Sequence, residues 1–317
     1  MTASPSIRIA TRASRLAMWQ AEHVAALLRQ VDPTVLVEIV PLSTIGDRDQ
    51  SEPLVRLGSE GVFTREVQNA VLDGRADVAV HSLKDLPTVE TSGLCLAAVP
   101  ERGPTSDAIV FPPSQPGAKS LDDLPQNARV GTGSPRRRAQ LLHRRPDLQF
   151  LDARGNVETR LRKLDAGEYN ALVLAEAGLT RLGLAGRISG LIQPPVMLPA
   201  VGQGALGIEC RDDDTVTREL LARVNDDSTR RAVIAERVLL AELKAGCHAP
   251  VGVWTQPVGG NLRLEGVVLS TDGCRRLVAE TTGPADQPET VGRQVAKLLR
   301  DQGADELIAS SDSHRPT

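Results

Sequence analysis

The sequence predicts an α/β fold in which helices cover parallel-rich sheets, followed by a smaller α+β region. Short β-branched apolar segments alternate with helical periodicity over the first two-thirds of the chain. This alternation is typical of parallel strands joined by right-handed crossovers. A Pro- and Gly-rich stretch at 112–117 interrupts the pattern, which then restarts and indicates a second lobe. From about residue 228 a long helix is followed by consecutive strands, so the last region belongs to another class.

The first region should contain four strands and two helices. We expect strands at 7–10, 35–40, 78–81 and 94–99, and helices at 14–31 and 65–73. Gly74 suits the position just beyond the second helix, where left-handed backbone is common. Residues 42–61 combine polar residues and glycines without a period, so we expect a long loop that could act as a lid.

The later regions can be assigned in the same way. We expect strands at 129–131, 149–151 and 171–174, with helices beginning at Pro135 and after Asn156. The third region should hold a helix at 229–245, strands at 251–254, 262–269 and 277–281, and a helix at 289–300. The polar tail at 310–317 should be disordered.

Composition narrows the class of protein. The 317 residues suffice for two or three domains, and the net charge of −3 with only 2% aromatic residues argues against a nucleic-acid partner. Four cysteines without a C-x-x-C pair or a metal-type cluster indicate reduced thiols and no metal. No signal peptide or membrane-length apolar run is evident, so we expect a cytoplasmic protein away from membranes.

The most informative motif is Gly-Thr-Gly-Ser-Pro-Arg-Arg-Arg at 131–138. Ser134 can cap a helix that has Pro135 at its first position. Three arginines would then repel the positive end of the helix dipole, unless they and the free backbone N–H groups converge on an anion. The motif therefore predicts a site for carboxylates or phosphates.

Other cations of residues 129–163 fall into two groups. Arg144, Arg145, Arg162 and Lys163 lie late in helices and should form a solvated face. Like Arg136 and Arg137, Arg154 and Arg160 stand at strand-to-helix junctions, where bidentate anion recognition is available. Ligands of such sheets bind outside the carboxyl ends of the strands. Residues 11–12, 81–85, 131–138 and 152–156 should therefore line one cleft.

Two loops carry residues suited to chemistry. In the loop after residue 81, Asp85 would stay ionised in a cationic cleft and could balance a developing positive charge. The alternative is a surface turn closed by Pro87. Cys247 follows a helix in a polar loop, where Lys244 and His248 could favour the thiolate, although an inert thiol is the alternative. Cys95 and Cys210 lie in apolar strands and should pack as small hydrophobic groups.

Together these stretches resemble the porphobilinogen deaminase family, in order, from about residue 7 to 305. The matching segments are Arg-Ile-Ala-Thr-Arg at 8–12, Ala-Val-His-Ser-Leu-Lys-Asp-Leu-Pro at 79–87, Arg-Gly-Asn at 154–156, Thr-Arg-Leu at 159–161, Leu-Pro-Ala-Val-Gly-Gln-Gly-Ala at 198–205 and Ala-Gly-Cys at 245–247.

The resemblance implies two lobes like those of periplasmic binding proteins and a smaller α+β C-terminal domain. Domain 1 would be 1–104 with 200–224, domain 2 would be 105–199, and domain 3 would be 228–317 and carry the cysteine loop. It also implies a covalent dipyrromethane cofactor held by a thioether to Cys247, and a monomeric enzyme.

The implied reaction condenses four molecules of porphobilinogen head to tail into hydroxymethylbilane, with release of ammonia. Every ring carries an acetate and a propionate, which explains a cleft rich in guanidinium groups. Asp85 would be the catalytic residue. Cofactor binding would fall to Ser14, Lys84, Asp85, Thr132, Ser134, Arg136, Arg137 and Asn156. Substrate binding would fall to Arg12, Arg154, Arg160, Arg181 and Gln203.

The chain departs from the family pattern at several positions. Gly133 stands where a serine is frequent, so one hydroxyl contact is missing. Glu60 replaces a common lysine, which questions a carboxylate-holding role for the 42–61 loop. Arg15 and Arg138 add charge. Two rival functions remain: a non-catalytic anion-binding protein, which would have no use for Cys247, and a nucleic-acid-binding regulator, which the charge balance disfavours.

Overall fold

The computed structural model describes residues 6–42, 64–246 and 249–313. By its internal contacts the chain forms two units, of which unit 1 comprises 1–103 with 204–230 and unit 2 comprises 104–203 with 231–317. Each unit contains one five-stranded mixed sheet, and unit 2 also contains a three-stranded antiparallel sheet. No helix within the described ranges has the length and apolar character needed to cross a membrane.

Unit 1 is built around a sheet with strand order β2-β1-β3-β10-β4. Its strands are β1 (Ser6–Arg12), β2 (Leu36–Leu42), β3 (Val78–Ser82), β4 (Leu94–Ala98) and β10 (Leu206–Arg211). The first three run parallel, whereas β10 runs antiparallel to both β3 and β4. The strand that completes this sheet thus comes from a segment more than a hundred residues further along the chain.

Helices cover both faces of this sheet. They are α1 (Arg15–Val31), α3 (Arg65–Leu72) and α7 (Thr215–Ala222). Apolar residues of α1 and α7 pack with Ile9, Val80 and Ile208 on one face, while α3 packs on Ala10 and Ala79 on the other. Neighbouring residues of a strand therefore serve opposite cores, as the period of two requires.

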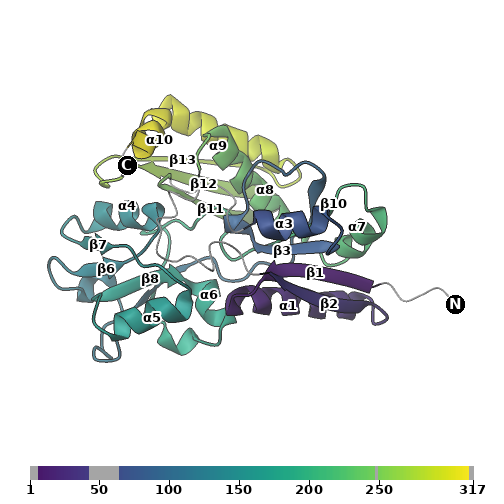
Figure 1. Cartoon of the computed structure of the whole chain (residues 1–317). Coiled ribbons are helices and arrows are strands. Elements are labelled where there is room, and N and C mark those ends of the chain that lie inside the picture. The colour runs from purple at the N-terminus through teal and green to yellow at the C-terminus, as the bar shows by residue number, and fades with distance from the viewer. Residues whose placement is uncertain (1–5, 43–63, 247–248, 314–317) are drawn as a thin grey trace. The chain divides into compact units, whose positions relative to one another are not determined.

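The five-stranded sheet of unit 2 repeats this arrangement with strand order β7-β6-β8-β5-β9. Its strands are β5 (Asp107–Val110), β6 (Arg129–Gly131), β7 (Gln149–Leu151), β8 (Ala171–Ala175) and β9 (Gly190–Ile192). Strands β6, β7, β8 and β9 run in one direction, and β5 runs antiparallel to both of its neighbours, β8 and β9. The helices are α4 (Pro135–Arg144), α5 (Val157–Asp165) and α6 (Glu176–Arg181). Helices α4 and α5 cover opposite faces of the sheet (Figure 1). There they bury Leu141 and Leu164 in two separate cores.

The C-terminal part of unit 2 is a sheet ordered β11-β12-β13 with helices packed on it. The elements are α8 (Asp227–Glu242, which begins in unit 1), β11 (Val251–Val258), β12 (Asn261–Leu269), β13 (Arg276–Pro284), α9 (Pro288–Asp301) and α10 (Ala304–Ser313). Its other face contacts α4, where His143 Nδ1 lies 2.9 Å from the carbonyl oxygen of Gly273.

Most sequence expectations for the elements are confirmed to within a few residues at each end, including the α/β class. Gly74 has a φ of 71° beyond α3, as expected of that position. The prediction of a disordered tail was wrong for residues 310–313. These residues continue α10, because Leu307 and Ile308 anchor that helix in the core. Strands β5 and β9 were not anticipated, and β10 was indicated only by the placement of Cys210 in an apolar strand. The expected 42–61 loop lies almost wholly outside the described residues.

Candidate functional site

In unit 1 the expected site residues gather at the carboxyl edge of the sheet. Arg12 ends β1, and Ser14 caps α1 by accepting a hydrogen bond from the N–H of Ala17 at 3.4 Å. Lys84 and Asp85 lie in the single 3₁₀ turn that follows β3. Because β1 and β3 are parallel neighbours, both ends lie at the same edge.

The turn that carries Asp85 is anchored from both sides. Leu83 and Leu86 are buried, and the N–H of Leu83 donates to the carbonyl oxygen of Ala205 at 3.0 Å. Just before the turn, Gln20 Nε2 donates to Ser82 Oγ at 2.7 Å. Asp85 itself is exposed, whereas Lys84 is half-buried. The fold therefore holds the backbone of this turn while leaving the carboxylate in solvent.

In unit 2 the expected residues follow the parallel strands β6, β7 and β8. Ser134 caps α4 by accepting from the N–H of Arg137 at 3.5 Å, with Pro135 in the first turn, as expected. Thr132 Oγ1 accepts from the N–H of Ser134 at 3.3 Å. Asn156 caps α5 through a 2.9 Å bond from the N–H of Thr159. Two helix N-termini thus meet the same sheet edge, a favourable place for anions.

The arginines at this edge differ in their surroundings. Arg154 is half-buried and its Nε contacts Asp152 Oδ2 at 2.5 Å, and Arg160 Nε donates to the Gly155 carbonyl at 2.8 Å. Arg181, at the end of α6, is also half-buried. Burial lowers the pKa of Arg181 to about 10, so it remains protonated at neutral pH.

Arg136 and Arg137 lie inside the protein on a buried carboxylate, Asp107 at the start of β5. Arg136 Nη1 lies 2.7 Å from Asp107 Oδ2, and Arg137 Nε lies 2.8 Å from Oδ1. The two guanidinium groups also donate to the carbonyl oxygens of Leu198 and Val173. A buried carboxylate therefore explains why two cations stand at the start of α4, and the sequence did not reveal it.

The charge balance of this Asp107 cluster is uneven, since two guanidinium groups face one carboxylate. Burial would raise the pKa of Asp107, but the charges and hydrogen bonds of Arg136 and Arg137 outweigh it and hold the pKa at about 2. Burial also lowers the pKa of Arg137, against the attraction of Asp107. One positive charge stays in excess behind the first turn of α4.

Gln203 joins the same cluster. It is buried, and its Nε2 donates to Asp107 Oδ1 at 3.1 Å and to the Thr105 carbonyl at 2.6 Å. Sequence reasoning missed Asp107, although an acidic residue opening the apolar run 107–110 was a usable signal.

Arg145 was expected on a solvated face, and this prediction was wrong. It donates to Asp147 at 2.7 Å and to the Leu121 carbonyl at 2.9 Å, which fixes the end of α4.

The helix that leads to Cys247 ends in a defined way. The N–H groups of Lys244 and Ala245 donate to the carbonyl oxygens of Ala241 and Leu240, and Lys244 adopts a left-handed φ of 50°. Cys247 itself lies outside the described residues. Within the described ranges, no group of three or more His, Cys, Asp or Glu side chains is suited to a metal ion.

Comparison with known proteins places this architecture in a family. Residues 7–219 match the model of the dipyrromethane cofactor binding domain of porphobilinogen deaminase, and residues 230–301 match its C-terminal domain. Among solved structures, the periplasmic VFT2 domain of Bordetella pertussis BvgS is 17% identical, with 70% of this chain and 87% of that chain covered and a TM-score of 0.42.

Curated relatives match over almost their whole length. Porphobilinogen deaminase of Syntrophotalea carbinolica is 45% identical, with 98% of this chain and 97% of the relative covered. The enzymes of Chromobacterium violaceum and Stenotrophomonas maltophilia are each 49% identical over 96% of this chain, and 97% and 99% of those relatives are covered. The chain belongs to the porphobilinogen deaminase family.

Proposed function

We propose that this chain condenses four porphobilinogen molecules head to tail into hydroxymethylbilane, releasing ammonia, as a transferase of tetrapyrrole biosynthesis. The observation that carries the proposal is the gathering of cationic and helix-capping residues at the carboxyl edge of each five-stranded sheet. Each ring of substrate and product brings two carboxylates, and such an edge compensates that charge.

The donor set fits the family's cofactor, a dipyrromethane that also carries two carboxylates on each ring. We assign its binding to Ser14, Lys84, Asp85, Thr132, Ser134, Arg136, Arg137 and Asn156, and its covalent attachment to Cys247. The bound cofactor supplies the pyrrole carbon to which the first substrate unit is joined. Arg136 and Arg137 contribute the excess charge of the Asp107 cluster, and Asp107 keeps both guanidinium groups in place.

Asp85 is the proposed catalytic residue. Its exposed carboxylate, on a turn whose backbone is anchored, is suited to accept hydrogen bonds from pyrrole N–H groups. A fixed negative charge there stabilises the cation that develops as ammonia departs. The carboxyl oxygen can also pass a proton to the departing amine.

Substrate carboxylates are assigned to Arg12, Arg154, Arg160 and Arg181. Asp152 and the Gly155 carbonyl orient Arg154 and Arg160. Gln203 supports substrate binding through the Asp107 cluster. A guanidinium fork matches carboxylate geometry in two hydrogen bonds, so each of these four cations can hold a ring carboxylate.

We further propose a monomer in the cytoplasm that is divided into three domains, 1–104 with 200–224, 105–199 and 228–317. Free thiols at Cys95, Cys210 and Cys274 are typical of a reducing compartment. Sedimentation of the purified protein measures the oligomeric state.

Intact-protein mass spectrometry tests the proposed function. Protein from a host that makes porphobilinogen should carry the added mass of one dipyrrole, and Cys247→Ser should lose it. Cys274→Ser is the matched control, because that cysteine is exposed and lies in another loop. Unmodified wild-type protein that still consumes porphobilinogen, or a modified Cys247→Ser variant, would contradict the assignment.

A further inference from the structure

Cys95 and Cys210 form a pair of thiols on neighbouring strands of unit 1. They lie directly opposite each other in the antiparallel ladder of β4 and β10. Opposed residues of a ladder point to the same face, and both cysteines contact the core beneath α1 and α7. Burial, together with the adjacent Cys95 side chain and a hydrogen bond to it, raises the pKa of Cys210 to about 12. The two thiols therefore lie side by side on one face of the sheet.

The ladder sets a spacing compatible with a disulfide. The N–H of Asp212 donates to the Gly93 carbonyl at 3.1 Å, so Asp212 and Gly93 form a hydrogen-bonded pair of the ladder. Such pairs recur every two residues, so Cys210 and Cys95 are also a hydrogen-bonded pair. Such Cα atoms are about 5.5 Å apart. Disulfides span roughly 4.4–6.8 Å between Cα atoms. Their Cβ atoms must approach to about 3.8 Å, closer than the ladder holds them, so the bond would be strained and readily reduced.

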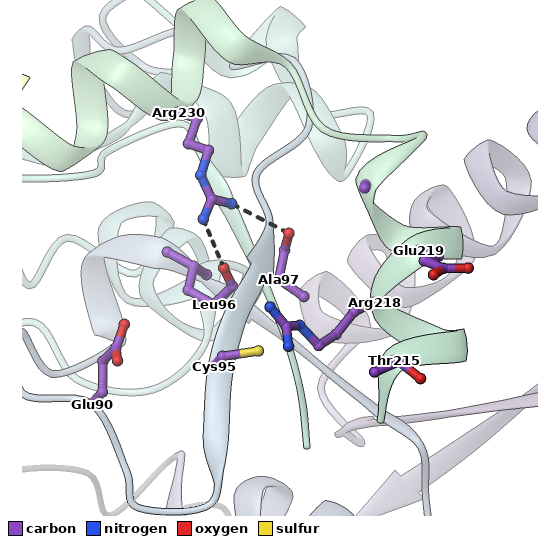
Figure 2. Close-up of a pocket in the computed structure, with 9 residues that line it drawn as sticks. Glu90, Cys95, Leu96, Ala97, Thr215, Arg218, Glu219 and Arg230 are labelled. Carbon is purple, nitrogen blue, oxygen red and sulfur yellow. Dashed lines mark hydrogen bonds between the residues drawn. The ribbon is translucent and has the colours of Figure 1, made fainter. Parts of the chain in front are cut away.

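A pocket gives solvent access to one of the two sulfurs. It has a volume of about 510 Å³ and is lined by Cys95 together with residues of α7 and Arg230 of α8. Figure 2 shows the Arg218 guanidinium extending toward the Cys95 sulfur. Arg230 donates to the carbonyl oxygens of Leu96 and Ala97, each at 3.2 Å, and so holds this edge strand in place. Cys95 is half-buried at the pocket wall, whereas Cys210 is fully buried.

We propose that Cys95 and Cys210 form a reversible redox site in which a peroxide oxidises Cys95 and Cys210 resolves the product into a cross-strand disulfide. The Cys95 thiolate attacks one oxygen of the peroxide and the O–O bond breaks. Hydroxide departs, and Cys95 becomes a sulfenic acid. The Cys210 sulfur then attacks the Cys95 sulfur, the S–O bond breaks, and the hydroxyl leaves as water with the Cys210 proton. Two electrons and two protons from a thiol reductant restore both cysteines.

This dithiol is separate in sequence and chemistry from Cys247. The disulfide would protect Cys95, because a sulfenic acid with a thiol on the opposed residue is captured before it reaches the irreversible sulfinic state. The strands β4 and β10 are already paired, so the disulfide needs a closer local approach of the two cysteines but no change of strand pairing.

Peptide mapping under non-reducing conditions tests the proposal. Full-length protein treated with hydrogen peroxide should yield a linked pair of peptides containing Cys95 and Cys210, and dithiothreitol should separate them. Cys210→Ser should abolish the link, and Cys95 should then be trapped by dimedone and proceed to sulfinic acid. Cys95→Ser should leave Cys210 a free thiol. Cys274→Ser is the control and should retain the link.

Two results would overturn it. One is wild-type protein in which Cys95 accumulates as sulfinic acid beside unmodified Cys210. The other is wild-type protein in which both cysteines stay reduced at a peroxide dose that oxidises the exposed Cys274. Because the link is read in wild-type protein, the outcome does not depend on either serine variant being stable.

Discussion

Replacing Asp107 with asparagine removes the carboxylate that holds Arg136 and Arg137 while keeping the size of the side chain. The variant leaves two buried guanidinium groups facing each other without a counter-charge. Breaking a buried pair from one side typically costs about 3–5 kcal/mol. The fall of the Asp107 pKa from 3.8 to about 2 corresponds to about 2 kcal/mol. We therefore expect a loss of about 2–5 kcal/mol in the free energy of unfolding at neutral pH.

The destabilisation caused by Asp107→Asn should depend on pH. The folded-state pKa is depressed, so the stabilisation is fully present above the unfolded pKa of 3.8 and is lost as the pH falls toward 2. Urea unfolding of wild type and Asp107→Asn should show a constant difference between pH 7 and 5. About half of the charge-dependent contribution should remain at pH 3.

A matched control separates a buried pair from an exposed one. Asp165 pairs with Arg187 at 2.6 Å, and these side chains are 37% and 28% exposed, whereas Asp107 has no exposed side-chain surface. Asp165→Asn should therefore cost less than about 1 kcal/mol. The reasoning is refuted if Asp107→Asn destabilises no more than this control, or if its effect is unchanged from pH 5 to pH 3.

Two further predictions concern the site edges. Asp85→Ala should lower porphobilinogen consumption at least about 100-fold and leave the urea midpoint unchanged, because the carboxylate is exposed. Asp73→Ala, an exposed carboxylate near α3, is the control, and near-normal turnover of Asp85→Ala would remove Asp85 from the mechanism. Gly131→Ala should destabilise by about 1–3 kcal/mol in thermal or urea unfolding, because its Cβ would lie 2.4 Å from Leu172 Cδ2 and 3.0 Å from the Tyr169 ring. Gly117→Ala, whose Cβ would meet nothing within 4 Å, should be neutral, and equal effects of the two would contradict the packing argument.

The sequence was sufficient to predict the helices, strands and caps whose signals lie within a few neighbouring residues. Apolar periodicity located β1, α1 and β3, and side-chain chemistry located the cap Ser134. It was insufficient where a partner is distant along the chain. Asp107 lies 29 residues from Arg136, so nothing local indicated that the arginine helix already had an internal anion. Pairing of β10 with β3 likewise depends on contacts that no periodicity encodes.

The candidate site was predictable to a similar extent. Strand order explains why residues at the ends of β1 and β3, or of β6 and β7, meet at one sheet edge, and this followed from alternation of strands and helices. The sequence could not distinguish a buried arginine from an exposed one on the same helix. Arg137 is buried and Arg138 is exposed, because successive helical residues point about 100° apart.

The late position of β10 imposes an order on biosynthesis. While the ribosome is still translating residues 104–203, β3 and β4 lack the strand that lies between them, and their backbone edges remain open. The five-stranded sheet of unit 2 has all of its strands within residues 107–192, so it can close before the sheet of unit 1 although its first strand is made later. At about 5–20 residues per second, the N-terminal sheet waits several seconds for its last strand. During that interval the open edges of β3 and β4 can pair with another chain or be captured by a chaperone.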